Sequence, residues 1–233
     1  MPEEFYNAAK NFSADVVYCE KFFETDSEAT TVTIRNLHGS DIVSEPLFET
    51  GNLSERIHKI LNLKFSVETV LKFVRRDFLF ENEIFFSHIK PSEDGIWTYG
   101  LIFFAKKFLR VPNVVYIRRL SDNSVMRTER TPTQEINFGI NSVVAGVKSL
   151  DNFMNKLEFF RQNIPYRYAM LEHFVHLAFG DLFEFSTRLA PSSIYETVKQ
   201  AQGKNFGEHD VLISFLLADL IEQQKNFVQL KNK

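Results

Sequence analysis

Two adjacent carboxylates, Glu93 and Asp94, stand where a polar segment gives way to an apolar helical pattern. A carboxylate within hydrogen-bond reach of a hydroxyl group can take its proton while the oxygen attacks another atom. The same pair also suits an ordinary helix start, because Ser92 can cap a helix and acids in the first turn complement the helix dipole. The residues alone leave both interpretations open.

Two basic residues are candidate contacts for a phosphate group. Arg119 ends a β-prone segment, and Lys72 begins a short basic run that reaches Arg76. Guanidinium groups match phosphate oxygens with paired hydrogen bonds, and lysine supplies a point charge. Trp97 lies one helical turn after Asp94, so its ring either lines a platform for a sugar or packs in the core.

A second set of side chains could hold a metal ion. Glu172, His173 and His176 fall within about one helical turn of each other, and such a site needs further ligands from a facing helix. Residues 208–210, which read Glu-His-Asp, could supply them. The two histidines fit partly buried helix positions equally well. Cys19 lies in a predicted buried strand, where a thiol is inert.

Composition limits the class of protein. The chain has 233 residues, 44% of them hydrophobic and 24% charged, with 25 phenylalanines, which is typical of a soluble globular protein. A formal net charge of −3 gives no electrostatic reason to expect nucleic acid. The single cysteine, the acidic start and the lack of any apolar stretch of about 20 residues predict a cytoplasmic protein without a transmembrane segment.

Periodicity predicts a mixed first half and a helical second half. Up to residue 128, apolar spacing and caps predict helices over 3–12, 52–61, 76–81 and 92–107, and strands over 15–19, 31–34, 65–70, 84–86, 108–111 and 114–119. From residue 131, helical patterns run to about 163, from 165 to about 189, from 191 onward and from about 208 to 230. We therefore expect an α/β domain over 1–128 and a helical domain over 129–233.

Three stretches, in this order, resemble the bacterial family 2 glycosyltransferases, which have the GT-A fold. Met1–Glu20, which ends in Phe12–Glu20, is similar to the helix and strand that follow the metal-binding Asp-x-Asp segment of these enzymes. Lys72–Leu79, with Glu81, Asn82 and Phe85, is similar to a segment before the acceptor site. Glu93-Asp94, followed by Ala105–Tyr116, Arg119 and Asp122–Val125, is similar to the catalytic Glu-Asp block and the strands after it.

The resemblance implies an acceptor-side half of a glycosyltransferase, with a partial GT-A-like mixed sheet and flanking helices. It implies Asp94 as catalytic base with Glu93 beside it, and Arg119, Lys72 and Trp97 as substrate-binding residues. It further implies a nucleotide-sugar donor, a glycan or lipid-linked acceptor in surface polysaccharide synthesis, and a divalent metal, Mg²⁺ or Mn²⁺.

The sequence departs from the family pattern at two points. It contains no Asp-x-Asp and no strand-helix-strand unit for the sugar nucleotide before Met1, and Val70-Leu71 stands where the family often has Trp-Asn. An enzyme completed by another segment is therefore one expectation. A non-catalytic remnant or interaction module is the other, with a sheet edge left open for self-association or for an N-terminal partner.

Overall fold

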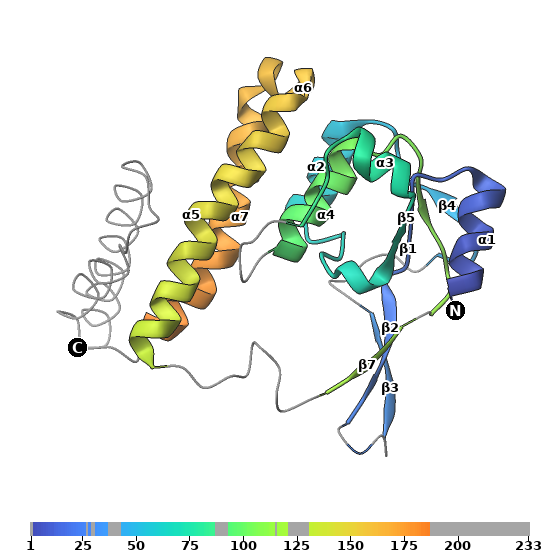
Figure 1. Ribbon diagram of the computed structural model, residues 1–233, viewed down its shortest axis with the longest axis horizontal. Helices are drawn as coiled ribbons and strands as arrows, with labels where there is room; N and C mark the ends of the chain where they lie inside the picture. The colour runs from blue at the N-terminus through green and yellow to red at the C-terminus, as the bar shows by residue number, and fades with distance from the viewer. Residues whose placement is uncertain are drawn as a thin grey trace. The chain divides into compact units, whose positions relative to one another are not determined.

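A computed structural model describes residues 2–26, 28, 31–36, 43–86, 93–114, 116–120 and 131–186. It is a mixed α/β structure, with two small mixed sheets and seven α-helices among these residues (Figure 1). The chain forms two compact units. The first comprises residues 1–87, 94–128 and 153–170, and the second comprises 88–93, 129–152 and 171–233. The predicted boundary after residue 128 stays a prediction.

The larger sheet of the first unit has the strand order β4-β6-β1-β5. β1 (Val16–Tyr18) pairs in parallel with β6 (Phe108–Arg110) and antiparallel with β5 (Lys72–Val74). β4 (Leu47–Phe48) pairs antiparallel with β6 on the other side. The two central strands are fully buried, which explains the continuous apolar character of their sequences.

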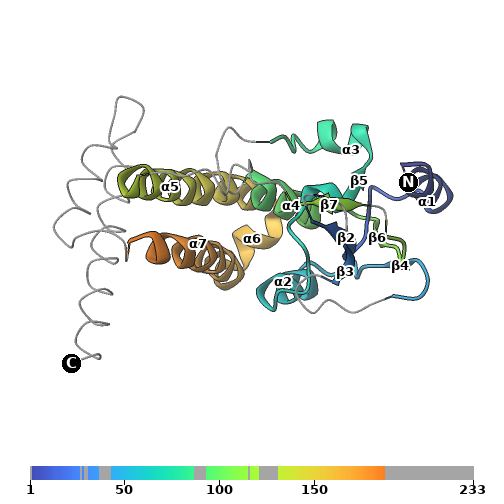
Figure 2. The ribbon, with the colours of Figure 1, turned by 90° about the horizontal axis from the view of Figure 1, so that it is seen from below.

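Helices lie on both sides of this sheet (Figures 1 and 2). α1 (Pro2–Phe12) packs with Phe5 against the side that presents Val17 and Leu109. The other side presents Tyr18 and Phe108, whose rings stack with centroids 4.6 Å apart. Successive strand residues face opposite sides of a sheet, so each helix layer meets alternate residues of the same strands.

Three further helices of the first unit are short and have clear boundaries. α2 (Leu53–Leu61) begins at Asn52, whose side chain accepts a hydrogen bond from the Ser54 amide at 3.0 Å. α3 (Arg76–Glu81) directly follows β5. α4 (Glu93–Phe104) is apolar on all sides, and each residue from Ile96 to Phe103 is buried. Such a helix belongs inside the unit, not at its surface.

α1, α2 and α3 are each followed within two residues by a residue with a left-handed backbone. These residues are Ser13, Leu63 and Glu83, with φ values of 49°, 54° and 54°. In each case the next amide donates back to the carbonyl five residues earlier, as Ile84 does to Leu79 at 2.9 Å. This is the pattern of a Schellman cap, which satisfies the last carbonyls of a helix.

The smaller sheet has the order β3-β2-β7. β2 (Lys21–Thr25) pairs antiparallel with β3 (Val32–Asn36) and in parallel with β7 (Ile117–Arg119). β2 follows β1 after only two residues, Cys19 and Glu20. The carboxyl end of β1 is therefore the point where the chain passes from one sheet to the other.

The second unit contains most of α5 (Pro132–Lys156) and α7 (Ile164–Ser186), which lie side by side in both views (Figures 1 and 2). Their approach is close, because a Cβ atom added at Gly146 would clash with the Phe174 ring. The short α6 (Glu158–Gln162) belongs to the first unit, where Phe160 packs edge-on against Phe103 with centroids 4.9 Å apart.

Most predicted elements of the first half are confirmed. The helices over 3–12, 52–61 and 76–81 and the strands over 15–19, 31–34 and 108–111 are present within about two residues, and the strand over 114–119 is reduced to β7. The long helical pattern after residue 131 is also present, interrupted at Leu157. The predicted helix start at Ser92 and the helices expected beyond residue 190 lie outside the described residues.

Four predicted features are wrong. Residues 84–86 form no strand, because Ile84 completes the cap of α3. Residues 65–70 form no strand, because Ser66 turns the chain with a hydrogen bond to the Glu68 amide at 3.2 Å. α4 stops at Phe104 and not at Lys107. Residues 24–51, whose polar composition predicts mainly loop, contain β4 and the end of β2.

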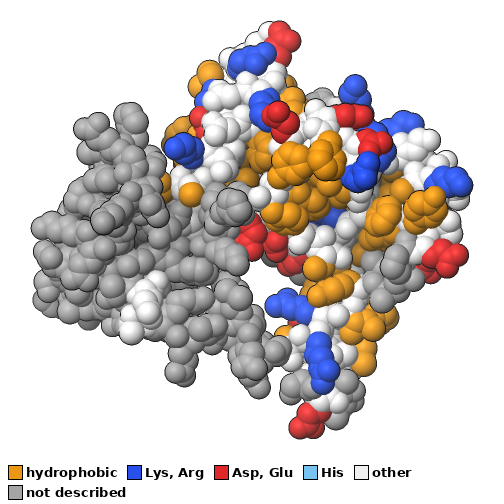
Figure 3. Space-filling model, viewed as in Figure 1, with side chains coloured by type: hydrophobic (Ala, Val, Ile, Leu, Met, Phe, Trp, Pro, Cys, Tyr) orange, Lys and Arg blue, Asp and Glu red, His pale blue; other side chains and the backbone are white. Residues whose placement is uncertain are grey.

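Exposed aromatic side chains gather near α3. Phe80, Phe85 and Phe86 are each more than half exposed, and the Phe80 and Phe85 rings meet edge-on with centroids 5.4 Å apart. Figure 3 shows hydrophobic side chains collected over the region of α3 and α4. This unit therefore exposes a group of aromatic side chains beside α3.

A buried polar cluster crosses the side of the large sheet that carries Tyr18. The Arg110 guanidinium contacts Glu49 at 2.7 Å and donates to the Tyr18 hydroxyl oxygen at 2.7 Å. The Tyr18 hydroxyl donates to Glu49, and Lys59 on α2 pairs with the second carboxylate oxygen at 2.6 Å. Tyr18, Glu49 and Arg110 are at most 6% exposed. The cluster therefore ties β1, β6 and α2 to the chain after β4.

Burial alone would raise the pKa of Glu49, but its hydrogen bonds from Lys59 and Tyr18 and the charge of Arg110 lower it overall. A carboxylate with a lowered folded pKa stabilises the protein above its unfolded pKa of about 4.3 and loses that contribution as the pH falls. The cluster is therefore expected to weaken in acid.

We expect Glu49→Ala to lower the free energy of unfolding by about 3–5 kcal/mol, because it leaves the Arg110 charge buried without its partner. Urea denaturation followed by circular dichroism measures the change. The matched control is Glu24→Ala, which removes the surface pair with Arg35 and should cost less than about 1 kcal/mol. Equal losses in the two variants would contradict a structural role for the buried cluster.

Candidate functional site

The carboxyl ends of the parallel strands β1 and β6 carry the polar residues of the candidate site. Ligands of α/β proteins usually bind outside this end of a parallel sheet. Glu20 follows β1 here and is buried, and its carboxylate lies 3.5 Å from the Ser66 amide. The segment from Ser66 to Leu71 thus runs past the end of β1 before it enters β5.

Asp94 is held beside this segment from the first turn of α4. The Thr69 hydroxyl donates to the Asp94 carboxylate at 3.3 Å. One turn further along, the Thr98 hydroxyl donates to the Val67 carbonyl at 2.9 Å. These two bonds fix the amino end of α4 against residues 66–71, while the Asp94 side chain stays exposed to solvent. An exposed, positioned carboxylate can meet an incoming hydroxyl group.

The Lys72 ammonium lies in the same neighbourhood. It donates to the carbonyls of Ser66 at 2.8 Å and Glu68 at 2.7 Å, which leaves one of its three N–H groups for another partner. Burial lowers the pKa of Lys72 to about 8, against the opposing charges of Glu20, Glu68 and, more weakly, Asp94. The lysine and the acid predicted from separate sequence motifs therefore both bind the segment of residues 66–71.

A small hollow of about 180 Å³ adjoins this cluster. Glu68 and Val70, the two neighbours of Thr69, form part of its wall. Tyr116 and Arg118 form another part. The hollow has room for one functional group of a ligand and not for a whole sugar nucleotide.

The remaining predicted site residues lie in different surroundings. Glu93 is half-buried at the first position of α4. Trp97 is 7% exposed, and one face of its ring stacks on Phe86 with centroids 4.9 Å apart. Arg119 is exposed on β7, in the smaller sheet. The structure thus places Lys72 and Asp94 against the same segment, residues 66–71, and the roles of all five predicted site residues stay predictions.

Three residues of the cluster were missed in the sequence. Thr69 and Glu68 were assigned to a β-strand, which hid their position beside Asp94, and Glu20 was treated as the end of a strand motif. Ser66 was a usable signal, because a serine side chain often binds the backbone amide two residues on and so closes a local turn. In the structure the Ser66 hydroxyl donates to the Glu68 carboxylate.

Within the described part of the chain, no three His, Cys, Asp or Glu side chains are placed to hold a metal ion. His173 is half-buried, and burial together with the charge of His176 lowers its pKa. Residues 208–210, the other half of the predicted metal site, lie outside the described residues.

Comparisons with protein-family models, with curated proteins and with solved structures found no match. None of the helices that the structure describes is long and apolar enough to cross a membrane.

The lowered pKa of Lys72 predicts a rise in stability at alkaline pH. Between pH 8 and 10.5 the unfolded lysine binds a proton that the folded one has lost, so stability should increase with pH. The free energy of unfolding of the wild type should rise, relative to that of Lys72→Met, by at most about 1.4 kcal/mol per pH unit in this range. Urea titrations of both proteins at pH 7, 8, 9 and 10 measure the difference. A difference that stays constant or shrinks would show that Lys72 is solvated.

Proposed function

We propose that this chain is the acceptor-side part of an inverting family 2 glycosyltransferase, with Asp94 as the catalytic base. One observation supports the proposal: Asp94, through Thr69, and Lys72 both bind the segment 66–71, which contacts Glu20 at the carboxyl end of β1. The resemblance of residues 1–128 to that family supports the choice of reaction. The donor is a nucleotide sugar, and the acceptor is a glycan or a lipid-linked glycan.

The chemistry is a direct displacement at the anomeric carbon of the donor sugar. The acceptor oxygen forms the new bond to that carbon while the bond to the nucleotide diphosphate breaks, and the bonding electrons leave with the phosphate oxygen. Asp94 takes the acceptor proton, becomes a carboxylic acid and later returns the proton to water. Thr69 keeps the carboxylate in place, because its hydroxyl donates to the Oδ1 atom.

Negative charge that develops on the leaving diphosphate needs a positive partner. Lys72 has one N–H group beyond those held by its two carbonyl partners, and at pH 7 it is mostly protonated because its pKa is about 8. Arg119 is the second proposed contact. The rest of the donor site belongs, in this proposal, to a segment outside the printed sequence.

An interaction module derived from such an enzyme is the alternative. Within the described residues, β5 is an edge strand of the large sheet, which leaves room for another strand. The small size of the hollow beside Glu68 also favours this alternative, because a complete donor site would be larger.

In a protein that carries the donor-binding segment as well, we expect Asp94→Asn to lower kcat by about 10²–10⁴-fold with little change in acceptor KM, since general base catalysis contributes about that factor. Transfer of a radiolabelled sugar measures the rate. The matched control is Asp77→Asn, an exposed aspartate at the start of α3, which should keep full activity. Undiminished transfer by Asp94→Asn would remove Asp94 from the role of base.

For the printed chain alone, we expect no tight binding of sugar nucleotides in the presence of Mn²⁺. The hollow beside Glu68 holds about 180 Å³, whereas pockets for ligands of this size measure several hundred Å³. Isothermal titration calorimetry with a panel of UDP-, GDP- and CMP-sugars tests this. Micromolar affinity for any of them would contradict the proposed division of the enzyme into two parts.

A further inference from the structure

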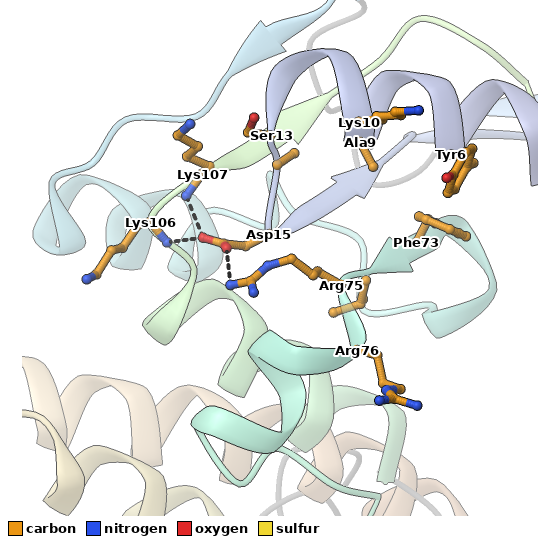
Figure 4. A pocket seen from close by; sticks show the side chains of 12 residues that line it. Tyr6, Ala9, Lys10, Ser13, Asp15, Phe73, Arg75, Arg76, Lys106 and Lys107 are labelled. Carbon is orange, nitrogen blue, oxygen red and sulfur yellow. Dashed lines mark hydrogen bonds and ion pairs between the residues drawn. The ribbon is translucent and has the colours of Figure 1, made fainter.

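A large groove lies at the opposite, amino end of the parallel strands. Its volume is about 810 Å³, and it is formed by α1, by the residues before β1 and β6, and by β5 with the first residue of α3 (Figure 4). Asp15 organises one end of it. The carboxylate accepts hydrogen bonds from the amides of Lys106 and Lys107 and from the Arg75 guanidinium, all at 3.0 Å.

The groove combines an apolar lining with an excess of positive charge. Tyr6, Ala9 and Phe73 belong to its apolar part. Five of the lining residues are basic and one, Asp15, is acidic; the basic ones are Lys10, Arg75, Arg76, Lys106 and Lys107. Several Lys and Arg side chains also lie on the surface around α1 and α3 (Figure 3). The charge of the groove favours an acidic ligand.

The form of the groove favours an extended ligand. In Figure 4 the charged ends of Lys10, Arg76 and Lys106 point in different directions and do not converge on one point. A single phosphate group would need them to converge. A bilayer surface would need the apolar side chains to protrude, whereas Ala9 and Phe73 line a hollow.

One wall of the groove is an open strand edge. Val17 pairs with Phe73, and the flanking hydrogen bonds run from Arg75 to Asp15 and from Cys19 to Leu71. Hydrogen-bonded pairs alternate with non-hydrogen-bonded pairs along an antiparallel ladder. Val74 pairs with Val16 at a non-hydrogen-bonded position, so its N–H and C=O groups point away from β1. Among the described residues, β5 ends the sheet on this side.

We propose that this groove binds an extended acidic segment of polypeptide, which adds to the large sheet as a strand beside β5. The backbone groups of Val74 would pair with the added strand, and alternate side chains would enter the groove beside Phe73. Strand addition of this kind takes its affinity from main-chain hydrogen bonds and its specificity from side-chain pockets. A second copy of the chain docked by the same face is disfavoured, because the basic residues would then face each other.

The test uses a fluorescein-labelled heptapeptide of alternating Glu and Val, capped at both ends, and measures fluorescence anisotropy. We expect the wild type to bind it at least tenfold more tightly than the same peptide with Lys in place of Glu. The affinity should also fall between 50 and 500 mM salt, because exposed charges are screened. Equal affinity for the two peptides would overturn the proposal.

Val74→Pro is the decisive variant. Proline removes the outward N–H group without breaking a hydrogen bond to β1, so binding should weaken at least tenfold while the circular dichroism spectrum is unchanged. Val74→Ile keeps the N–H group and should bind like the wild type. Unchanged binding by a folded Val74→Pro protein would overturn strand addition.

A second variant covers the case in which Val74→Pro does not fold. Lys10 and Arg76 are exposed, so the double variant Lys10→Glu, Arg76→Glu should fold and should bind the acidic peptide at least tenfold more weakly. Undiminished binding by this double variant would overturn the proposal. If the wild type sediments as a dimer and Val74→Pro does not, the strand edge pairs with a second copy of the chain. If the protein binds anionic vesicles but not the peptide, the groove binds a membrane. Either result would also overturn the proposal.

Discussion

The position of the candidate site depends on one buried ion pair, between Arg110 and Glu49. Two buried charges are costly unless both are fully satisfied. Arg110 meets this condition through Glu49 and the Tyr18 hydroxyl, and Glu49 through Lys59 as well. A pair of this kind tolerates little displacement, because any lost partner leaves a charge in the core. The pair therefore fixes β1, β6 and α2 as one rigid group.

A chain of contacts leads from this group to Asp94. Arg56 on α2 donates to the carbonyls of Ile102 and Ala105 and so holds the carboxyl end of α4. The Thr98 hydroxyl holds the amino half of the same helix against Val67. Asp94 is thereby placed at the carboxyl end of β1 by contacts at two points of α4. Ligands of α/β proteins usually bind at this end of the sheet.

Local patterns in the sequence were sufficient to predict most helices and strands of the first unit. The cap at Asn52 and the apolar runs of β1 and β6 are signals that act within a few residues. The same approach failed where distant contacts decide the structure. The β-prone residues 65–70 form a loop, because the distant Thr98 hydroxyl binds the Val67 carbonyl in addition to the local turn at Ser66. Thr98 is not visible in a local window. Asp94 and Lys72 were predicted singly, whereas their neighbourhood and the groove beside β5 required the fold.

The effect of Asp94 on the pKa of Lys72 is the most direct test of whether the two residues share a site. Lys72 can be titrated by NMR through its side-chain carbon and nitrogen signals. We predict a pKa of about 8 in the wild type and a lower value in Asp94→Asn, because removal of the nearby negative charge makes the buried ammonium less favourable. Asp77→Asn should leave the value unchanged. A Lys72 pKa near 10.5, or one that does not respond to Asp94→Asn, would contradict a shared site.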